Sequence, residues 1–321
     1  MKKLFRSNVA ALACFAWLAA PAFAQSGTMK IVIAFPPGGP VDFVARILAE
    51  GLAKELSQAV VVDNRPGANG AISAQVVAKS VPDGNTLWLS SAGAVVMNPS
   101  LYESLTYDVQ RDFVPVSLIV NNSEVLVVNP ANPARSASEL VAQSKQKPDA
   151  VPIASSGIGS MPHLALELFA DASGAKVLHV PYKGAAPAIT DVMGNQVAGF
   201  FGDIPGLIGF IRGGKLKALG IAAPARNPLL PDVPTLDEQG IRGVESNNWY
   251  ALFAPAKTPP ARIAQVNAAV RRVLGSDPYR ARLTESGADP APGSPGELAA
   301  LVRSDGAKWG RIIRDKRIKG E

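Results

Sequence analysis

Short apolar runs alternate with amphipathic stretches along most of the chain. Met29–Phe35 is almost entirely apolar, as in a strand buried on both faces, and the apolar residues of Val41–Leu56 then recur at helical spacing. The alternation continues with a β-branched strand at Ala59–Asp63, a helix at Ala71–Ser80 and a strand at Thr86–Ser90. Because strands that alternate with helices pair in parallel, the pattern predicts an α/β fold on a doubly wound parallel sheet.

The second half of the chain repeats this alternation and then returns to the first sheet. Strands are predicted at Glu124–Val128, Pro152–Ala154, Val177–Pro181, Gln196–Phe201, Lys217–Ala222 and Asn248–Pro255. Helices are predicted at Ala137–Lys145, Pro162–Ser173, Pro260–Leu274, Asp277–Ser286 and Gly296–Ile313. A chain that leaves one sheet, builds another and comes back predicts two doubly wound domains joined by a two-strand hinge, with the ligand crevice between them. The predicted domain 1 comprises residues 25–123 and 248–321, and domain 2 comprises residues 124–247.

Residues 1–24 have the pattern of a cleavable signal peptide. Lys2, Lys3 and Arg6 precede the apolar run Val9–Ala20, and an A-x-A cleavage pattern follows at 22–24. The run is shorter than the ~20 residues that span a bilayer. The segment therefore predicts export to the periplasm rather than a retained membrane anchor.

Loss of this segment changes the charge and the cysteine content. Of 32 basic and 26 acidic residues, 29 and 26 would remain, and Cys14, the single cysteine, would be lost. Arg311–Lys319 is locally basic but is typical of a solvated helix end, so no nucleic-acid partner is predicted. With no thiol, and with His163 and His179 in different predicted elements, neither a metal site nor a cofactor is expected.

Two glycine-rich segments stand where a strand is predicted to lead into a helix. They are Phe35–Asp42 and Ser155–Ser160. Glycine permits positive φ and close approach, so consecutive N–H groups and a helix N-terminus can converge on one anion. Either segment alone could be a tight turn, and Asp42 could be a helix cap. The pair, with one segment in each predicted domain, favours a cleft that closes on a carboxylate.

An ordered set of motifs resembles the Bug family of periplasmic solute-binding proteins. The motifs are Ile-Ala-Phe-Pro-Pro-Gly-Gly-x-x-Asp-x-x-Ala-Arg at 33–46, Val-Val-Asp-Asn-Arg-Pro-Gly-Ala-Asn-Gly at 61–70, Pro-Asp-Gly-Asn-Thr-Leu at 82–87, Ser-Ser-Gly-Ile-Gly-Ser-Met-Pro-His at 155–163, Val-Pro-Tyr-Lys-Gly-Ala-Ala-Pro-Ala at 180–188 and Leu-Pro-Asp-Val-Pro-Thr at 230–235. These proteins serve tripartite tricarboxylate transporters and are similar to the TctC proteins. Each motif is weak alone, whereas the ordered set covers essentially the whole mature chain.

The resemblance implies a type II periplasmic-binding fold that holds a ligand carboxylate with backbone amides and waters from the two glycine loops. It implies a small mono-, di- or tricarboxylate, amino acid or aromatic acid as ligand, membrane permease subunits as partners, and a monomer. Carried over by position, the ligand-binding residues are Pro37, Gly38, Gly39 and Asp42 in the first loop, and Ser156, Gly157, Gly159, Ser160 and His163 in the second. Strand and loop ends add Ser90, Ser91, Tyr182 and Lys183, the last either as a point charge for the ligand or in a solvated turn.

One position departs from the family pattern. The family usually has an acidic residue followed by Asn after the apolar strand near 200, whereas this chain has Gly202 and then Asp203. Asp203, Lys183 and His163 are therefore our candidates for reading the distal end of the ligand. An ionised Asp203 would favour a hydroxyl or an ammonium there and would disfavour a second carboxylate.

Other functional classes are also considered. A serine hydrolase would need a nucleophile elbow, and no G-x-S-x-G occurs. A nucleotide enzyme would need a P-loop or a complete G-x-G-x-x-G, and Gly157-Ile158-Gly159 lacks the third glycine. No catalytic residues are therefore assigned. A periplasmic sensor that reports its ligand to a signalling partner would look the same in sequence and stays an alternative, with a carboxylate- or ester-processing enzyme less favoured.

Overall fold

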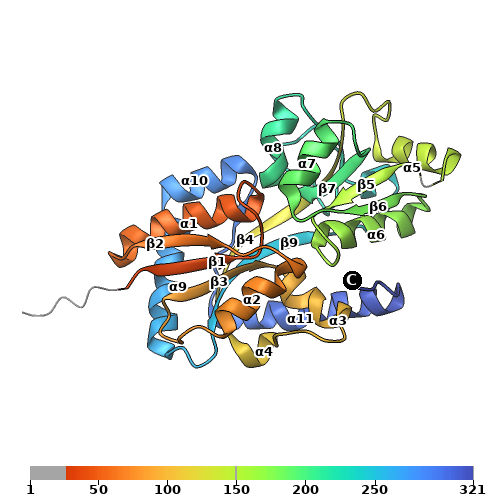
Figure 1. Cartoon of the computed structure of the whole chain (residues 1–321). Coiled ribbons are helices and arrows are strands. Elements are labelled where there is room, and N and C mark those ends of the chain that lie inside the picture. The colour runs from red at the N-terminus through yellow and green to blue at the C-terminus, as the bar shows by residue number, and fades with distance from the viewer. Residues whose placement is uncertain (1–26, 149, 321) are drawn as a thin grey trace, which may run out of the picture.

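The computed structural model describes residues 27–148 and 150–320. The predicted signal peptide at 1–24 lies outside the described residues. Two lobes of mixed α/β structure are joined across a continuous, curled sheet, which runs through the middle of the molecule (Figure 1). Within the described ranges no helix is both long enough and apolar enough to cross a membrane.

The sheet has ten strands in the spatial order β2-β1-β3-β9-β4-β7-β5-β6, with β8 and β10 also paired to β4. Their bounds are β1 (Met29–Ile33), β2 (Val60–Asn64), β3 (Thr86–Ser91), β4 (Phe113–Val128), β5 (Pro152–Ser155), β6 (Leu178–Pro181), β7 (Gly199–Asp203), β8 (Lys217–Ile221), β9 (Asn247–Pro255) and β10 (Asp289–Pro290). β1 is parallel to β2 and β3, and β5 is parallel to β6 and β7. β4 and β9 instead run antiparallel to their neighbours. The sheet is therefore parallel at its two ends, as predicted, and antiparallel at its centre.

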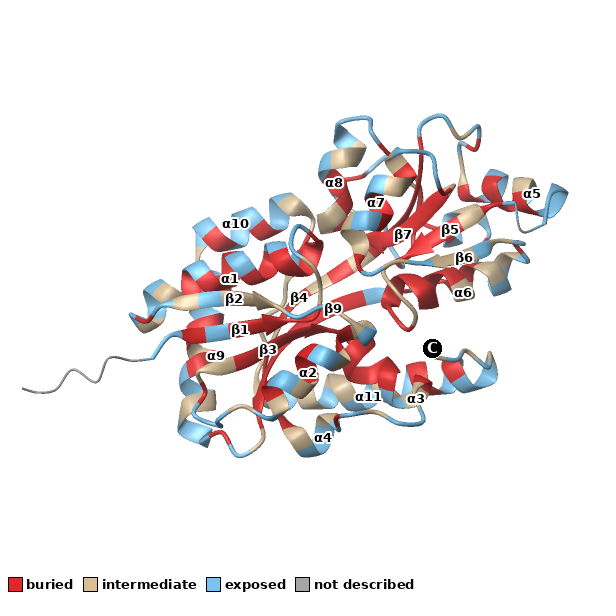
Figure 2. Ribbon diagram, viewed as in Figure 1, coloured by how far each residue is buried: buried red, intermediate tan, exposed pale blue. Residues whose placement is uncertain are grey.

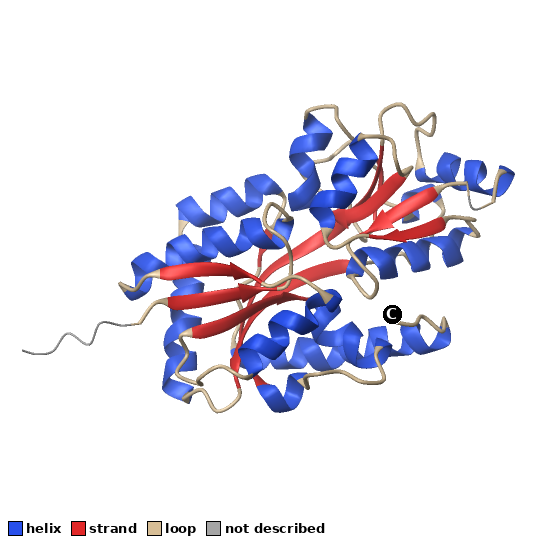
Figure 3. Cartoon of the chain, viewed as in Figure 1, coloured by secondary structure: helices blue, strands red, loops and turns tan. Residues whose placement is uncertain are grey.

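Helices cover both faces of each half of the sheet (Figure 3). In the first lobe, α1 (Pro40–Leu56), α9 (Pro260–Gly275) and α10 (Asp277–Ser286) cover one face, while α2 (Ala71–Ala78), the π-turn Gly93–Met97, α3 (Asn98–Leu101) and α11 (Pro295–Asp315) cover the other. In the second lobe, α5 (Ala137–Gln146) and α6 (Met161–Ser173) lie opposite α7 (Ala185–Met193) and α8 (Ile204–Arg212). Short helical segments at α4 (Val109–Asp112), Ala68–Gly70 and Asp237–Gln239 complete the described elements. The inner strands of the sheet are the most buried part of both lobes, whereas the edge strands β2 and β6 are half-buried or exposed (Figure 2).

The sheet passes from one lobe to the other within β4. β4 pairs with β9 as far as Ser123 and with β7 from Glu124 onward. The sequence prediction had only the second part of this strand, Glu124–Val128. The missed part, 113–123, contains Pro115 and two register shifts against β9. These irregularities interrupt the simple alternation by which a strand is recognised in sequence.

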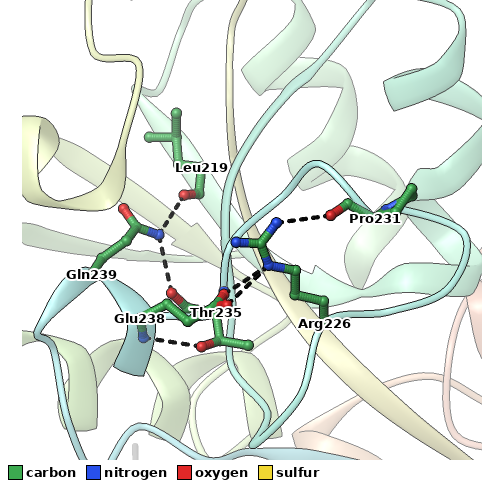
Figure 4. Close-up of polar contacts among 6 residues, drawn as sticks. All are labelled: Leu219, Arg226, Pro231, Thr235, Glu238 and Gln239. Carbon is green, nitrogen blue, oxygen red and sulfur yellow. Dashed lines mark hydrogen bonds and ion pairs between the residues drawn. The ribbon is translucent and has the colours of Figure 1, made fainter.

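The long connection from β8 back to β9 is held by side chains rather than by a helix (Figure 4). Arg226 pairs with Glu238 at 2.9 Å and donates to the Pro231 carbonyl at 3.0 Å. Glu238 also accepts from the Thr235 amide at 2.7 Å, and Gln239 donates to the Leu219 carbonyl at 2.9 Å. These contacts give the connection a fixed path, so that β9 re-enters the sheet beside β4.

Candidate ligand-binding site

A small cavity, partly open to solvent, lies between the lobes, at the ends of β1, β5 and β7. Its volume is about 20 Å³, which is room for about one water molecule. The lining comes from both lobes: Phe35, Pro36, Gly39, Pro40, Val41 and Asn248 from the first, and Ser156, Pro162, Ala185, Ala186, Phe200 and Asp203 from the second. Small-molecule sites are typically some hundreds of Å³. A ligand therefore needs the lobes to separate before it can enter.

Two helices from opposite lobes start at this cavity without side-chain caps. α1 begins at Pro40 after Gly39, and α7 begins at Ala185 after Gly184. Neither cap residue has a side chain that could accept from the first-turn amides, and both helices are long enough to have a dipole. Free N–H groups and two positive helix ends thus face one small space. This arrangement suits an anion such as a carboxylate.

The first glycine loop is held in shape by Asp42. Its carboxylate accepts from the Gly38 amide at 3.1 Å, from Arg46 at 2.8 Å and from Asn64 at 3.0 Å. Burial raises the pKa of Asp42, but the hydrogen bonds from Arg46, Asn64 and Gly38 outweigh burial, so that its pKa lies below the ordinary value. Asp42 therefore stays ionised. Because the Gly38 amide donates to Asp42, it is not available to a ligand. Gly39, the next residue, is the part of this loop that lines the cavity.

The second glycine loop satisfies most of its own amides. Gly159 donates to His163 Nδ1 at 3.1 Å, Gly157 donates to Ser155 Oγ at 3.2 Å, and Ser160 caps α6 by accepting from the His163 amide. Ser160 Oγ also donates to the Gly157 carbonyl at 2.6 Å. The N-terminus of α6 is thus capped from within the loop, whereas the N-terminus of α7 is not.

Two stacked histidines form hydrogen bonds to residues of this loop. The rings of His163 and His179 lie 4.0 Å apart and almost parallel, and His179 Nε2 is 2.7 Å from Ser155 Oγ. Burial lowers the pKa of His179 to about 4, and the neighbouring His163 adds to this effect. Ser155 is fully buried. The Ser155–His179 contact therefore holds the loop in place and is not reachable by a substrate.

Another part of the cavity wall is formed by acceptor oxygens, at Asn248 and at Asp203, the N-cap residue of α8. Asp203, at the end of β7, accepts from Asn248 Nδ2 at 3.1 Å and from the Tyr250 hydroxyl, both with the same oxygen, Oδ2. Glu124 faces Asp203 across the β4–β7 pair and is fully buried. Burial raises the pKa of Asp203 to about 7, and burial together with the charge of Asp203 raises the pKa of Glu124 well above its ordinary value.

Contacts across the cleft hold the lobes together. Asn69 Nδ2 of the first lobe donates to the Gly159 carbonyl of the second at 2.7 Å. Lys316, after α11, pairs with Asp171 of α6 at 2.5 Å. At two further points glycine allows a proline ring to approach. A Cβ on Gly184 would lie 2.9 Å from Pro36, and one on Gly206 would lie 3.2 Å from Pro40. The described conformation is therefore the closed one.

The residues singled out in the sequence take three kinds of position. Gly39, Ser156 and Asp203 line the cavity. Five residues lie behind that lining and make the hydrogen bonds that shape the two loops: Asp42, Gly157, Gly159, Ser160 and His163. Ser90 and Ser91 are also behind the lining, buried where β3 pairs with β9. Away from it lie Pro37, Gly38 and Lys183, which are exposed, and Tyr182, whose hydroxyl donates to Asp191 at 2.6 Å. The structure thus brings one residue of each glycine loop and Asp203 to the same space.

The sequence analysis missed the α7 N-terminus and Asn248. A signal for α7 was present, because Gly184 is followed by Ala185 and Ala186, then by a proline in the first turn, and by buried Ala188 and Ile189 one turn later. Asn248 was read only as the first residue of a strand. No local pattern distinguishes it, since its place in the site comes from the register of β9 against β4.

Gly38 and Gly159 offer a matched pair of substitutions. Both have positive φ, +83° and +76°, so alanine costs a similar strain of about 1 kcal/mol at each. A Cβ on Gly38 meets open space, whereas one on Gly159 would lie 2.4 Å from Leu101 of the other lobe. We expect Gly159→Ala to weaken ligand binding about 10-fold and Gly38→Ala to change it less than 3-fold, as measured by calorimetry. Equal losses would show that closure at Gly159 does not limit binding.

Two α/β lobes, a chain that crosses between them twice and a cavity at the strand ends define a periplasmic binding protein of the two-domain class. The family model described as "Tripartite tricarboxylate transporter family receptor", TctC, matches residues 44–318, and the chain belongs to this family. The protein BugT of Bordetella pertussis is 36% identical over 308 residues, which are 95% of this chain and 94% of BugT. These matches confirm the family indicated by the sequence motifs.

Solved structures agree over the whole fold. The periplasmic binding protein BugD superposes with a TM-score of 0.88 at 32% identity, covering 92% of this chain and 99% of BugD. Rpa4515 of R. palustris, solved with adipate, gives a TM-score of 0.89 at 32% identity over 92% of this chain and 99% of its own. MatC of Rhodopseudomonas palustris, solved with malate, gives 0.86 at 33% identity over 90% and 99%. The predicted type II periplasmic-binding fold is thereby confirmed.

Proposed function

We propose that the chain captures a small carboxylate between its two lobes in the periplasm and delivers it to the membrane permease of a tripartite tricarboxylate transporter. The observation that carries the proposal is the meeting of two uncapped helix N-termini, at Gly39 and Gly184, in one cavity. An anion placed there is stabilised by free amides and by both helix dipoles. Relatives solved with adipate and with malate support a carboxylate as the anion.

We further propose that binding is a domain closure. In this view residues 25–123 with 248–321 form one domain and residues 124–247 the other, and both chain crossings bend near Ser123–Glu124 and Asn247–Asn248. The change of pairing partner along β4 at Ser123 supports this division. The small cavity volume supports it too, since an acid the size of malate fits only after the lobes part.

A panel of carboxylic acids tests the proposal by thermal shift and calorimetry. A ligand at 100 times its dissociation constant should stabilise the protein by about 2.7 kcal/mol. Matched alcohols without the carboxylate, such as 1,6-hexanediol beside adipate, should give no shift. A panel in which no acid shifts the melting temperature would contradict carboxylate binding, and conversion of a bound acid into a product would contradict a transport role.

A further inference from the structure

The wall formed by Asp203 and Asn248 presents two acceptor oxygens without partners. Both residues line the cavity and each is only 6% exposed. Oδ2 of Asp203 accepts from Asn248 and from Tyr250, whereas Oδ1 of Asp203 and Oδ1 of Asn248 have no hydrogen-bond partner among the described residues. Buried polar atoms are paired in nearly all proteins. Two such atoms on one cavity wall therefore point to a donor supplied by the ligand.

The orientation of the Asn248 amide follows from its neighbour. Asn248 donates from its NH₂ group to Asp203, and this orientation is required whenever Asp203 is ionised, as beside an ammonium, because a carboxylate only accepts hydrogen bonds. The amide oxygen is then the free atom. Because the two side chains touch, the free Asn248 oxygen and the free Asp203 oxygen belong to the same wall.

The number of donors decides which group fits. A ligand hydroxyl or a protonated carboxyl has one hydrogen to donate and would leave one of the two oxygens unpaired. An ammonium has three donors and can satisfy both. A buried acceptor that stays unpaired is costly, so the wall discriminates between these groups.

The charge of Asp203 also favours an ammonium on the ligand. The hydrogen-bond partners of Asp203, Asn248 and Tyr250, are both neutral, and the nearest ionisable neighbour across the strands is another acid, Glu124. The N-terminus of α8, which Asp203 precedes, is a partial positive charge only, and the Asp203 side chain makes no hydrogen bond to the α8 amides. A buried carboxylate without a full cation is unfavourable, and a ligand cation relieves this. A second carboxylate at the same wall would be repelled.

We propose that Asp203 and Asn248 bind an ammonium group, so that the ligand of this chain is a small amino acid with its carboxylate at the N-termini of α1 and α7. The assignment rests on the proposed carboxylate-binding function and narrows its substrate class. Asp203 stands at the position where this chain departs from the family pattern, with Gly202 before it.

Ligand triplets that differ in one substituent test the assignment. The triplets are aspartate, malate and succinate; 4-aminobutyrate, 4-hydroxybutyrate and butyrate; and alanine, lactate and propionate. In the triplet that binds most tightly we expect the amino member to bind about 100-fold more tightly than the unsubstituted acid, with the hydroxy acid between them. Asp203→Asn should reduce that ratio to less than about 5-fold, because the charge-assisted bond is lost.

Glu124→Gln is the matched control. It also removes one buried carboxyl on the same strand pair, but Glu124 is not part of the cavity lining. Because the charges of Glu124 and Asp203 repel each other, removing Glu124 favours the ionised form of Asp203, so this variant should keep the preference for the amino member or increase it. A circular dichroism spectrum and a cooperative melt for each variant confirm that the fold is intact.

Proton exchange gives a second readout. The titratable groups that face Asp203 are Glu124 of β4 and Tyr250 of β9. Since the pKa of Asp203 is about 7 without ligand, an ammonium beside it favours the ionised form and releases a proton at pH 7. A second carboxylate would do the reverse and take one up. Calorimetry in two buffers of different ionisation enthalpy measures the sign, and Asp203→Asn should abolish the release.

Three outcomes overturn the inference. If an unsubstituted acid or a hydroxy acid binds at least as tightly as its amino analogue, Asp203 and Asn248 do not hold an ammonium, although carboxylate binding stands. If Asp203→Asn keeps the full preference, another group holds the ammonium. If no acid of any triplet binds, the carboxylate-binding function itself fails.

Discussion

Gly206→Leu should weaken binding of any cognate ligand by about 100-fold or more and leave the fold intact. Gly206 is in the first turn of α8, and a Cβ there would lie 3.2 Å from the Pro40 ring of the opposite lobe. A leucine side chain extends several ångströms beyond its Cβ, so it would overlap the Pro40 ring. The lobes could then close only if α1 and α8 moved apart. Strain of 1–3 kcal/mol in the closed state corresponds to about a 5- to 150-fold loss of affinity, and a full block exceeds this range.

Gly209→Leu is the control for that experiment. Gly209 is in the same helix, one turn later, but no atom lies within 4 Å of its Cβ position. Both substitutions replace a helical glycine and raise helix propensity by a similar amount, near 0.8–1 kcal/mol. Calorimetry should show normal affinity for Gly209→Leu, and small-angle scattering should show a more open Gly206→Leu. Equal affinities would mean that α8 does not approach α1 in the bound state.

Asp203→Asn should make the ligand-free protein more stable at neutral pH. The pKa of Asp203 is raised by burial to about 7 from the ordinary 3.8. In the unfolded chain the carboxyl ionises near pH 4, while in the folded protein it stays protonated up to about pH 7. The stability contributed by the protonated Asp203 is therefore complete below pH 4 and is lost as the pH rises from 4 to 7. The loss is on the order of 4 kcal/mol, at about 1.4 kcal/mol per pH unit.

Asparagine does not titrate, so the variant should escape that loss. We expect a melting temperature higher than that of the wild type by roughly 8 °C at pH 7.5, and a difference close to zero at pH 4. Differential scanning calorimetry at both pH values measures it. Glu124→Gln, whose parent residue also has a raised pKa, should show the same direction. A destabilised Asp203→Asn at pH 7.5 would show that the carboxylate has a favourable partner in the folded state.

Together with the ligand experiments, this result would separate stability from function. Asp203 is expected to lower the free energy of unfolding of the ligand-free protein at neutral pH. Once an ammonium is bound, the same residue is expected to provide selectivity. Binding sites often keep groups that a purely structural optimum would replace. The same substitution should therefore stabilise the fold and reduce discrimination among ligands.

The sequence allowed most of the fold to be predicted where elements follow simple periodicities. Helix α1 was predicted at Val41–Leu56 and is observed at Pro40–Leu56, because apolar residues repeat at helical spacing behind Gly39-Pro40. Helices α9 and α10 and the first three strands were predicted equally closely. α7 and α8 were not predicted, because each has a proline in its first turn and α8 also contains Gly206 and Gly209, residues that usually mark a break in a helix.

The site was less predictable because it depends on pairing between distant strands. Glycine loops are visible in sequence, and Gly39 and Ser156 do lie at the cavity. The sequence does not show which loop amides are already used, as those of Gly38 and Gly159 are by Asp42 and His163. Nor does it show Asn248, which reaches the cavity only through the register of β9.

The return of β9 to the first lobe has a consequence for how the polypeptide folds. Ser91 of β3 pairs with Tyr250, about 160 residues later in the chain. The first lobe therefore lacks its central strand, and the helices packed around it, until almost the whole polypeptide is available. Contacts between such distant residues have to overcome a large loop-closure entropy and form slowly. A newly made chain with this topology therefore stays incompletely folded until nearly all of it has been synthesised.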